Sequence, residues 1–380
     1  MLPDPVIPIG PPTIGPPTIG PLETRHGANA AARASGGRVD PPLLEARNVT
    51  KRYGGGPLSG TGMTALADLS LTLRAETPGI TAVVGESGSG KTTLARLLLG
   101  LTPPTEGQVL YRGQDLTALR GAGRRAFLRE VQAVFQDPYE VYNPFYRVDH
   151  VLTTPVAKFK LAASRAEGRQ LIEEALRAVG LRPEEILGRF PHQLSGGQRQ
   201  RIMVARAVLM RPRLIVADEP VSMVDASLRA TILGSLRALT DERGISIIYI
   251  THDLATAYQV SDHVLVMYQA QVVEAGAVER VVKHPQHPYT QRLIAAIPRV
   301  STTRDWLEGE DSPPARASPS RERCRFVDDC PAAMPRCATA SPPLYRTEEH
   351  RTVACFQYDA APALLPGEMD AVLTPVPGSG

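Results

Sequence analysis

Apolar and polar residues follow two different periods along residues 43–298, and together these periods predict an α/β core. In the stretch 69–73 leucine alternates with Ser70 and Thr72, which is the pattern of a half-buried strand. Continuous apolar runs indicate strands covered on both faces, as in a parallel sheet; they lie at residues 80–84, 131–135, 214–217 and 245–250. Helical spacing appears between these runs, so strands and helices are expected to alternate.

The chain divides by composition into four parts. Residues 1–41 repeat Ile-Gly-Pro-Pro-Thr and then become rich in Ala, Gly and Arg, which predicts a disordered tail. Residues 42–298 hold the predicted α/β domain, with a mostly helical stretch at about 137–211. Residues 299–360 form a C-terminal extension that begins as a linker and then contains every cysteine. Residues 361–380 are rich in Pro and Gly and are predicted to be a flexible tail.

Charge and hydropathy exclude some classes of function. A net charge of +3 over 380 residues gives no basic surface that would favour nucleic acid as a partner. No apolar run reaches the roughly 18–20 residues that a membrane-spanning helix needs. The N-terminus also lacks the charged and apolar pattern of a signal peptide. We therefore expect a soluble, cytoplasmic protein whose membrane role, if any, comes through a partner.

A glycine-rich loop between a predicted strand and a predicted helix is the first candidate site. It reads Gly-Glu-Ser-Gly-Ser-Gly-Lys-Thr, which fits the phosphate-binding pattern G-x-x-x-x-G-K-[ST]. The backbone N–H groups and the positive end of the helix would cradle phosphates, while Lys91 adds a charge and Thr92 a hydroxyl for Mg²⁺. The candidate ATP contacts are Gly85, Glu86, Ser87, Gly88, Ser89, Gly90, Lys91, Thr92 and Thr93.

Two carboxylates follow the apolar run 214–217. Asp218 stands at the end of this predicted strand, where doubly wound sheets bind their ligands, and is expected to be a Mg²⁺ partner. Glu219 comes next in the chain. The loop and the carboxylate pair together predict a site for a nucleotide and Mg²⁺.

A third motif, Leu-Ser-Gly-Gly-Gln at residues 194–198, completes a set that resembles the nucleotide-binding domain of ATP-binding cassette (ABC) proteins. The resemblance implies an ABC-type P-loop NTPase with a RecA-like core, an antiparallel β subdomain and a helical signature subdomain. It also implies that Glu219 polarises the attacking water and that His252 contacts the γ-phosphate. Gln136 would sense Mg²⁺ and the water, and Tyr53 would stack on adenine.

In this family the signature motif serves the ATP held by the opposite subunit. The resemblance therefore implies a head-to-tail dimer, in which one chain cannot complete a site. The residues that would reach the partner's ATP are Ser195, Gly196, Gly197, Gln198 and Asp225.

Two further segments indicate the branch of the family. Asp137-Pro138 with Asn143-Pro144, and the run 287–298 that contains His-Pro-Tyr-Thr and Ala-Ile-Pro, resemble the ATPases of dipeptide and oligopeptide importers. That resemblance implies a paralogous ATPase partner, two transmembrane permease subunits and an extracytoplasmic binding protein, with the chain peripheral on the cytoplasmic face of the membrane. Nickel chelates or oligosaccharides are alternative substrates, and a non-transport ABC ATPase is the alternative class.

The cysteines form a cluster of their own. Cys324, Cys330, Cys337 and Cys355 are separated by five, six and seventeen residues. Four thiolates can hold a 4Fe–4S cluster or a tetrahedral zinc, and the spacing does not choose between them. A cytoplasmic setting argues against disulfides. Similarity to the importer ATPases implies the iron–sulfur cluster; zinc, disulfides and free thiols stay open.

Overall fold

A computed structural model describes residues 41–54, 62–136, 142–222, 224–297, 322–365 and 367–374. Residues 41–380 belong to one compact unit, which is described by itself. The predicted N-terminal tail lies outside the described residues except for its last residue, and so does the Asp137-Pro138 segment. Among the described helices, none combines the length and apolar character needed to span a membrane.

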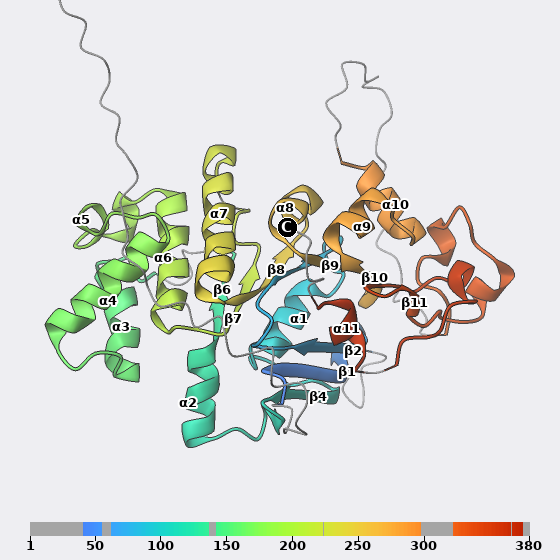
Figure 1. The fold of residues 1–380 in the computed structure, drawn as a ribbon, viewed down its shortest axis with the longest axis horizontal. Coiled ribbons are helices and arrows are strands. Elements are labelled where there is room, and N and C mark those ends of the chain that lie inside the picture. Colours follow the sequence, from blue (N-terminus) through green and yellow to red (C-terminus); the bar gives the residue numbers. More distant parts are fainter. Residues whose placement is uncertain are drawn as a thin grey trace, which may run out of the picture. The chain divides into compact units, whose positions relative to one another are not determined.

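The centre of this unit is an eight-stranded mixed sheet (Figure 1). Its spatial order is β11-β12-β10-β9-β3-β8-β7-β6. The five strands from β9 to β6 run parallel, and the other three add antiparallel pairs at the β9 edge. The strand bounds are β3 Ile80–Val84, β6 Val131–Val134, β7 Leu214–Asp218, β8 Ser246–Thr251, β9 His263–Tyr268, β10 Gln271–Ala277, β11 Tyr345–Glu348 and β12 Arg351–Val353.

The apolar runs of the sequence are the parallel strands, and each is buried on both faces. Along β3, Ala82 and Val84 belong to one hydrophobic cluster while Val83 belongs to the other. Tyr249 and Ile250 of β8 divide in the same way. Successive side chains of a strand point to opposite faces, so a strand covered on both sides must be apolar throughout. This confirms the fold class read from the sequence.

A second sheet covers one face of the first. It has the order β2-β1-β4-β5 and is antiparallel, with bounds β1 Leu44–Tyr53, β2 Met63–Leu73, β4 Glu106–Tyr111 and β5 Gln114–Asp115. Helix α1, Lys91–Leu98, packs between the sheets through Leu94, Leu97 and Leu98, which are all about 1% exposed or less. The β subdomain therefore fixes the helix that begins at the phosphate loop.

The stretch predicted to be helical forms a separate group of helices beyond β6 (Figure 1). It consists of α3 Asp149–Phe159, α4 Arg165–Ala178, α5 Pro183–Ile186 and α6 Gly196–Leu209. Helices α3 and α4 both pack against α6. Ala175, Leu176 and Val179, at the end of α4, are buried in the same hydrophobic cluster as the sheet residues Ala82 and Val84.

The other helices connect or cover the large sheet (Figure 1). Their bounds are α2 Gly121–Glu130, α7 Ala226–Arg243, α8 Leu254–Val260, α9 Val278–Lys283, α10 Pro288–Ala295 and α11 Met369–Val372.

The C-terminal extension differs from the sequence-based expectation. Its hairpin β11–β12 continues the main sheet, because β12 pairs with β10 from Glu274 to Gly276. The predicted flexible tail from residue 361 also needs correction over 361–365 and 367–374. Met369 and Val372 of α11 are buried against the β subdomain, and Arg74, the residue after β2, donates to Asp370 at 2.9 Å. Two apolar side chains three positions apart give this short segment its packing face.

Candidate nucleotide site

The glycine-rich loop joins β3 to α1 at the carboxyl end of the parallel strands. Gly85, Gly88 and Gly90 have φ angles of 152°, 80° and 105°, a region that side chains rarely allow. The structure also leaves no space for a side chain at Gly85 or Gly90. A Cβ at Gly85 would lie 2.1 Å from the Met267 carbonyl oxygen, and one at Gly90 would lie 2.4 Å from the Ala65 carbonyl oxygen.

Lys91 is folded back onto the loop that precedes it. Its Nζ donates to the carbonyl oxygens of Gly85 at 2.7 Å and Glu86 at 2.8 Å. Burial lowers the pKa of Lys91, and the nearby carboxylates of Glu219, Asp218 and Glu86 oppose this shift. A buried ammonium held by carbonyl dipoles and surrounded by carboxylates can bind a polyphosphate as a point charge.

Ser89 provides an independent sign of a ligand. Ser89 is only 3% exposed, and among the residues that the structure describes its hydroxyl has no hydrogen-bond partner. Buried hydroxyls are normally paired, so this one is free to bond an incoming oxygen. The residues of the loop therefore fit a nucleotide phosphate.

Asp218 and Glu219 lie at the end of β7, close to the loop. Burial raises the pKa of Asp218, and a hydrogen bond with the Thr92 side chain acts in the opposite direction. The strand order β3-β8-β7 brings these carboxyl ends to one edge of the sheet. Asp218 and Thr92 are thus together where the sequence predicted a Mg²⁺ site.

Glu219 is turned away from the strand direction. Its φ of 47° is unusual for a residue with a side chain, and its N–H donates to Ile250 O at 2.9 Å. Its Oε1 lies 2.9 Å from Nδ1 of His252, which follows β8. The structure therefore brings Glu219, the residue expected to polarise the attacking water, into direct contact with His252, the residue expected to contact the γ-phosphate.

The remaining predicted ATP contacts are distributed around this centre. Gln136 follows β6 and is exposed, while Thr93 and Tyr53 are half-buried at the start of α1 and the end of β1. The Tyr53 ring lies under the Lys51 ammonium at 5.1 Å. Glu86, Ser87 and Thr92 are exposed at the loop surface.

The signature motif makes its own local contacts. Ser195 is the N-cap of α6, and its hydroxyl accepts from the Gln198 N–H at 3.2 Å. The Gln198 side chain accepts from the Ser195 N–H at 2.9 Å, which completes a capping box. Gly197 lies against Leu228, whose Cδ1 would be 2.8 Å from a Cβ there. Ser195 and the N-cap of α7, Asp225, are both exposed.

The four cysteines lie in one module, but not as a metal site. Burial raises the pKa of Cys324 and Cys330 and raises that of Cys355 to about 11, and neighbouring thiols contribute to each shift. Within the described part of the chain, no three His, Cys, Asp or Glu side chains are grouped so that they could hold an ion. The structure therefore does not support the iron–sulfur or zinc prediction.

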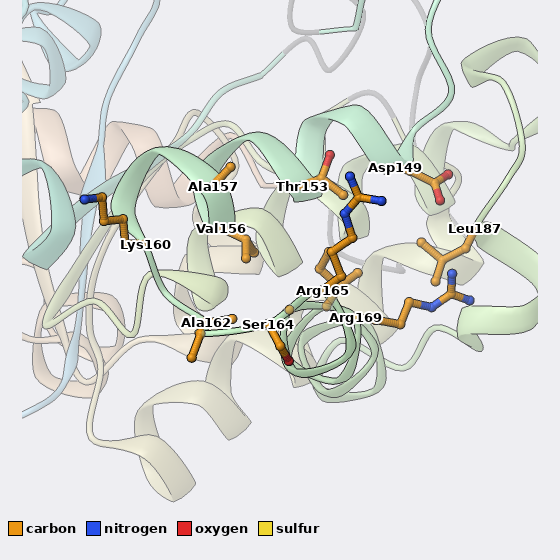
Figure 2. A pocket seen from close by; sticks show the side chains of 13 residues that line it. Asp149, Thr153, Val156, Ala157, Lys160, Ala162, Ser164, Arg165, Arg169 and Leu187 are labelled. Carbon is orange, nitrogen blue, oxygen red and sulfur yellow. The ribbon is translucent and has the colours of Figure 1, made fainter.

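A cavity of about 610 Å³ lies in the helical subdomain, between α3 and the start of α4 (Figure 2). Thr153 and Val156 line it from α3, and Arg165 and Gly168 line it from α4. None of the predicted nucleotide contacts is among the residues that line it. The nucleotide site is therefore the loop at the sheet edge and not this cavity.

Sequence reasoning missed two buried groups near this site. The Tyr289 hydroxyl accepts from the Glu86 N–H at 3.1 Å, which links the His-Pro-Tyr-Thr motif to the phosphate loop. Glu274 and Arg351 form an ion pair at 2.7 Å, and both side chains are 2% exposed or less. The motif had drawn attention to Tyr289, but no sequence pattern indicated its partner.

We expect Gly90→Ala to disturb the loop and Gly234→Ala to leave it intact. The new methyl at position 90 would meet a backbone carbonyl and strain the backbone by on the order of 1–3 kcal/mol. Gly234, inside α7, has open space and should gain about 0.5–1 kcal/mol on becoming alanine. Thermal unfolding and the dissociation constant of a fluorescent ATP analogue measure both effects. Unchanged nucleotide binding in Gly90→Ala would contradict the expected clash.

Comparison with known proteins places these features in a family. Residues 66–222 match the family described as ABC transporter, and residues 273–337 match the one described as oligopeptide/dipeptide transporter, C-terminal region. A probable peptide ABC transporter ATP-binding protein of Sinorhizobium fredii is 42% identical over 82% of this chain and 89% of its own length. The oligopeptide transport ATP-binding protein OppF of Escherichia coli is 39% identical over 76% and 87%.

Solved structures agree with the sequence relatives. An ATP-binding cassette determined as a dimer in a post-hydrolysis state with ADP and phosphate has a TM-score of 0.54 at 27% identity, covering 62% of this chain and 99% of its own. CbiO1 of Clostridium perfringens, part of an ABC transporter complex, has a TM-score of 0.56 at 26% identity, over 65% and 92%. The phosphate loop, the carboxylate pair and these relatives agree: the chain belongs to the ATP-binding subunits of ABC transporters, in the oligopeptide/dipeptide family.

Proposed function

We propose that this chain hydrolyses ATP to energise an importer of di- and oligopeptides. The observation that carries the hydrolytic part is the contact of Glu219 with His252 beside the Lys91 loop. The match of residues 273–337 to the oligopeptide/dipeptide C-terminal region supports the substrate class. Relatives named for oligopeptide and dipeptide transport, OppF and DppF, support it further.

In this proposal each group at the sheet edge has one task. Thr92, Asp218 and Gln136 would hold Mg²⁺, whose charge would offset that of the nucleotide phosphates. Glu219 accepts a proton from the attacking water, and His252 holds the Glu219 carboxylate in place while contacting the γ-phosphate. The positive φ of Glu219 aims its side chain away from the Mg²⁺ ligand that precedes it.

The signature motif is proposed to act on the ATP of a second subunit. Ser195 is exposed at the N-terminus of α6, where backbone N–H groups and the helix dipole favour an anion. A head-to-tail dimer would bring this end to the partner's γ-phosphate. We propose a paralogous ATPase as that partner.

An apolar groove supplies a surface for the permease subunits. It has a volume of about 330 Å³ and lies between α2, β6 and the helical subdomain. Leu101, Leu128 and Phe135 line it, although they are 57%, 40% and 37% exposed. Exposed apolar groups gathered in one groove mark an interaction site. Because Gln136 follows Phe135, a helix docked here would reach the nucleotide site, on the cytoplasmic face of the membrane in this proposal.

A metal or iron–sulfur centre at the cysteines is a separate proposal. Its support is the sequence spacing and the raised pKa values of Cys324, Cys330 and Cys355, to which burial contributes most and neighbouring thiols contribute in part. Against it stands the lack of a grouped ligand set in the described residues. Iron, zinc and acid-labile sulfide analysis of anaerobically purified protein tests it. Absence of all three would leave a module held by packing alone.

Uptake of labelled peptides tests the proposed function. We expect cells that lack this gene to lose uptake of a dipeptide and a tetrapeptide, and the wild-type gene to restore it. Lys91→Ala should restore nothing, since it removes the charge that binds phosphate. Leu128→Glu should keep ATP hydrolysis in the purified protein but fail to restore uptake, because it places a charge in the groove.

The outcomes separate the parts of the proposal. Unchanged peptide uptake in the deletion strain would refute peptide as substrate and direct the same assay to nickel chelates and oligosaccharides. Full uptake with Leu128→Glu would refute the groove as the permease surface.

A further inference from the structure

Tyr289 connects the C-terminal region to the phosphate loop. It lies in the first turn of α10, is 1% exposed, and accepts the Glu86 N–H at 3.1 Å. Glu86 is the second residue of the loop. None of the proposed steps of hydrolysis uses this hydroxyl.

The peptide unit between Gly85 and Glu86 is held at both ends. Its carbonyl oxygen accepts from Lys91 Nζ at 2.7 Å, and its N–H donates to Tyr289. Rotation of this peptide would break both hydrogen bonds and leave the part-buried Glu86 N–H without this partner. Tyr289 therefore controls the orientation of the carbonyl against which Lys91 rests.

The ring of Tyr289 is in turn held by the cysteine module. Phe326, two residues after Cys324, packs edge-on against Tyr289 with centroids 5.7 Å apart. Tyr268 at the end of β9 contacts both rings, at 4.4 Å from Tyr289 and 5.3 Å from Phe326. Phe326 is 2% exposed, so the module and the nucleotide domain share this aromatic cluster.

A second contact joins the module to the same loop. Arg325 donates to Gln269 O in the β9–β10 turn, and the next residue, Ala270, donates its N–H to Ser89 O at 2.9 Å. Gly90 and Gly85 also lie against this turn and the end of β9. The module thus reaches both the beginning and the end of the loop.

Packing of the aromatic rings alone does not explain why residue 289 carries a hydroxyl. A phenylalanine would fill the same space between Tyr268 and Phe326, whereas only a tyrosine satisfies the Glu86 N–H. Burial raises the pKa of Tyr289, so the hydroxyl stays neutral and the contact does not change with pH over the physiological range.

We propose that Tyr289 is a positioning residue of the phosphate loop and that Phe326 makes this loop, and hence ATP affinity, depend on the C-terminal cysteine module. The inference rests on nucleotide binding at Lys91 and not on the transported substrate, so failure of the peptide assay leaves it intact. It gives the module a role whether or not the thiols bind a metal.

Tyr289→Phe tests the positioning role in the full chain. We expect the dissociation constant of a fluorescent ATP analogue to rise about five- to thirtyfold, since the part-buried Glu86 N–H loses its partner. The kcat at saturating ATP should change less than about twofold, because Glu219 and His252 keep their contact. Tyr268→Phe is the matched control, as its hydroxyl receives the Gln269 amide instead of a loop N–H. An ATP affinity equal to that of the wild type would overturn the proposal.

A double-mutant cycle tests the link to the module. Phe326→Leu keeps an apolar side chain but loosens the Tyr289 ring, and it should weaken ATP binding about two- to fivefold in the wild type. In the Tyr289→Phe background the same change should have almost no further effect. Equal effects in both backgrounds would show that the module does not act through Tyr289. Loss of ATP binding in Lys91→Ala, with the wild type bound, confirms that the assay reports this site.

Discussion

Glu219→Gln should abolish steady-state ATP hydrolysis while leaving ATP binding intact. The amide cannot accept the proton of the attacking water, and removal of a general base costs about 10²- to 10⁴-fold in rate. Lys91, Thr92 and the loop glycines, which hold the phosphates in our proposal, are unchanged. Phosphate release and binding of a fluorescent ATP analogue measure the two quantities separately.

The substituted protein should also accumulate in the ATP-bound, associated form. Hydrolysis is what reopens the proposed dimer, so a subunit that cannot hydrolyse remains closed on ATP and Mg²⁺. Size-exclusion chromatography with the partner ATPase, with and without ATP, would show this. An ATP-independent elution position would contradict the proposed cycle.

Glu242→Gln is the matched control for this experiment. Glu242 is an exposed carboxylate on α7, so the same chemical change there should leave hydrolysis within about twofold of the wild type. Near-normal turnover in Glu219→Gln itself would show that another group activates the water. His252, 2.9 Å away, would then be the first residue to test.

The parallel core was predictable because strands that are buried on both faces appear in the sequence as nearly continuous apolar runs. Residues 80–84 and 245–250 are mainly apolar, with Thr81 and Ser246 as polar exceptions, and they coincide with the central strands β3 and β8 to within one residue. The phosphate loop was predictable for a similar local reason, since its glycines need positive φ angles. The capping box of Ser195 and Gln198 is also contained within four residues.

Contacts between distant segments were not predictable in this way. Tyr289 and Glu86 are 203 positions apart, and nothing within their own segments indicates that they meet. The tail after residue 361 was read as flexible from its prolines and glycines. Its packing depends on two side chains, Met369 and Val372, whose partners lie on the β subdomain. Composition describes a segment by itself, whereas its order depends on the surface that receives it.

The C-terminal extension is thus part of the nucleotide domain in structural terms. It adds β11 and β12 to the main sheet and places Phe326 in the main hydrophobic cluster. It also contacts Tyr289 and the β9–β10 turn, which both bond to the phosphate loop. An appended module held only by metal ligands would show none of these contacts. The extension can therefore influence the ATP site through these contacts. The contacts depend on how firmly the extension is attached to the sheet.

The attachment depends on one buried ion pair, and Arg351→Met should destabilise the protein strongly. Arg351 on β12 donates to Glu274 on β10 at 2.7 Å, and the two side chains are 2% and 0% exposed. Without the guanidinium, Glu274 keeps its backbone donors, the N–H groups of Gln286 and His287, but its charge is uncompensated. Removing one partner of a buried pair costs about 3–5 kcal/mol.

Urea unfolding followed by circular dichroism measures this loss against two further variants. Arg280→Met breaks an ion pair with Glu348 between side chains that are 61% and 34% exposed, and it should cost less than about 1 kcal/mol. Replacing both Glu274 and Arg351 with methionine should recover part of the stability, because no charge is left buried. Because Glu274 also holds the His287 N–H at the start of α10, Arg351→Met should weaken ATP binding through Tyr289. Equal costs for Arg351→Met and Arg280→Met would show that the hairpin is held by its backbone pairing instead.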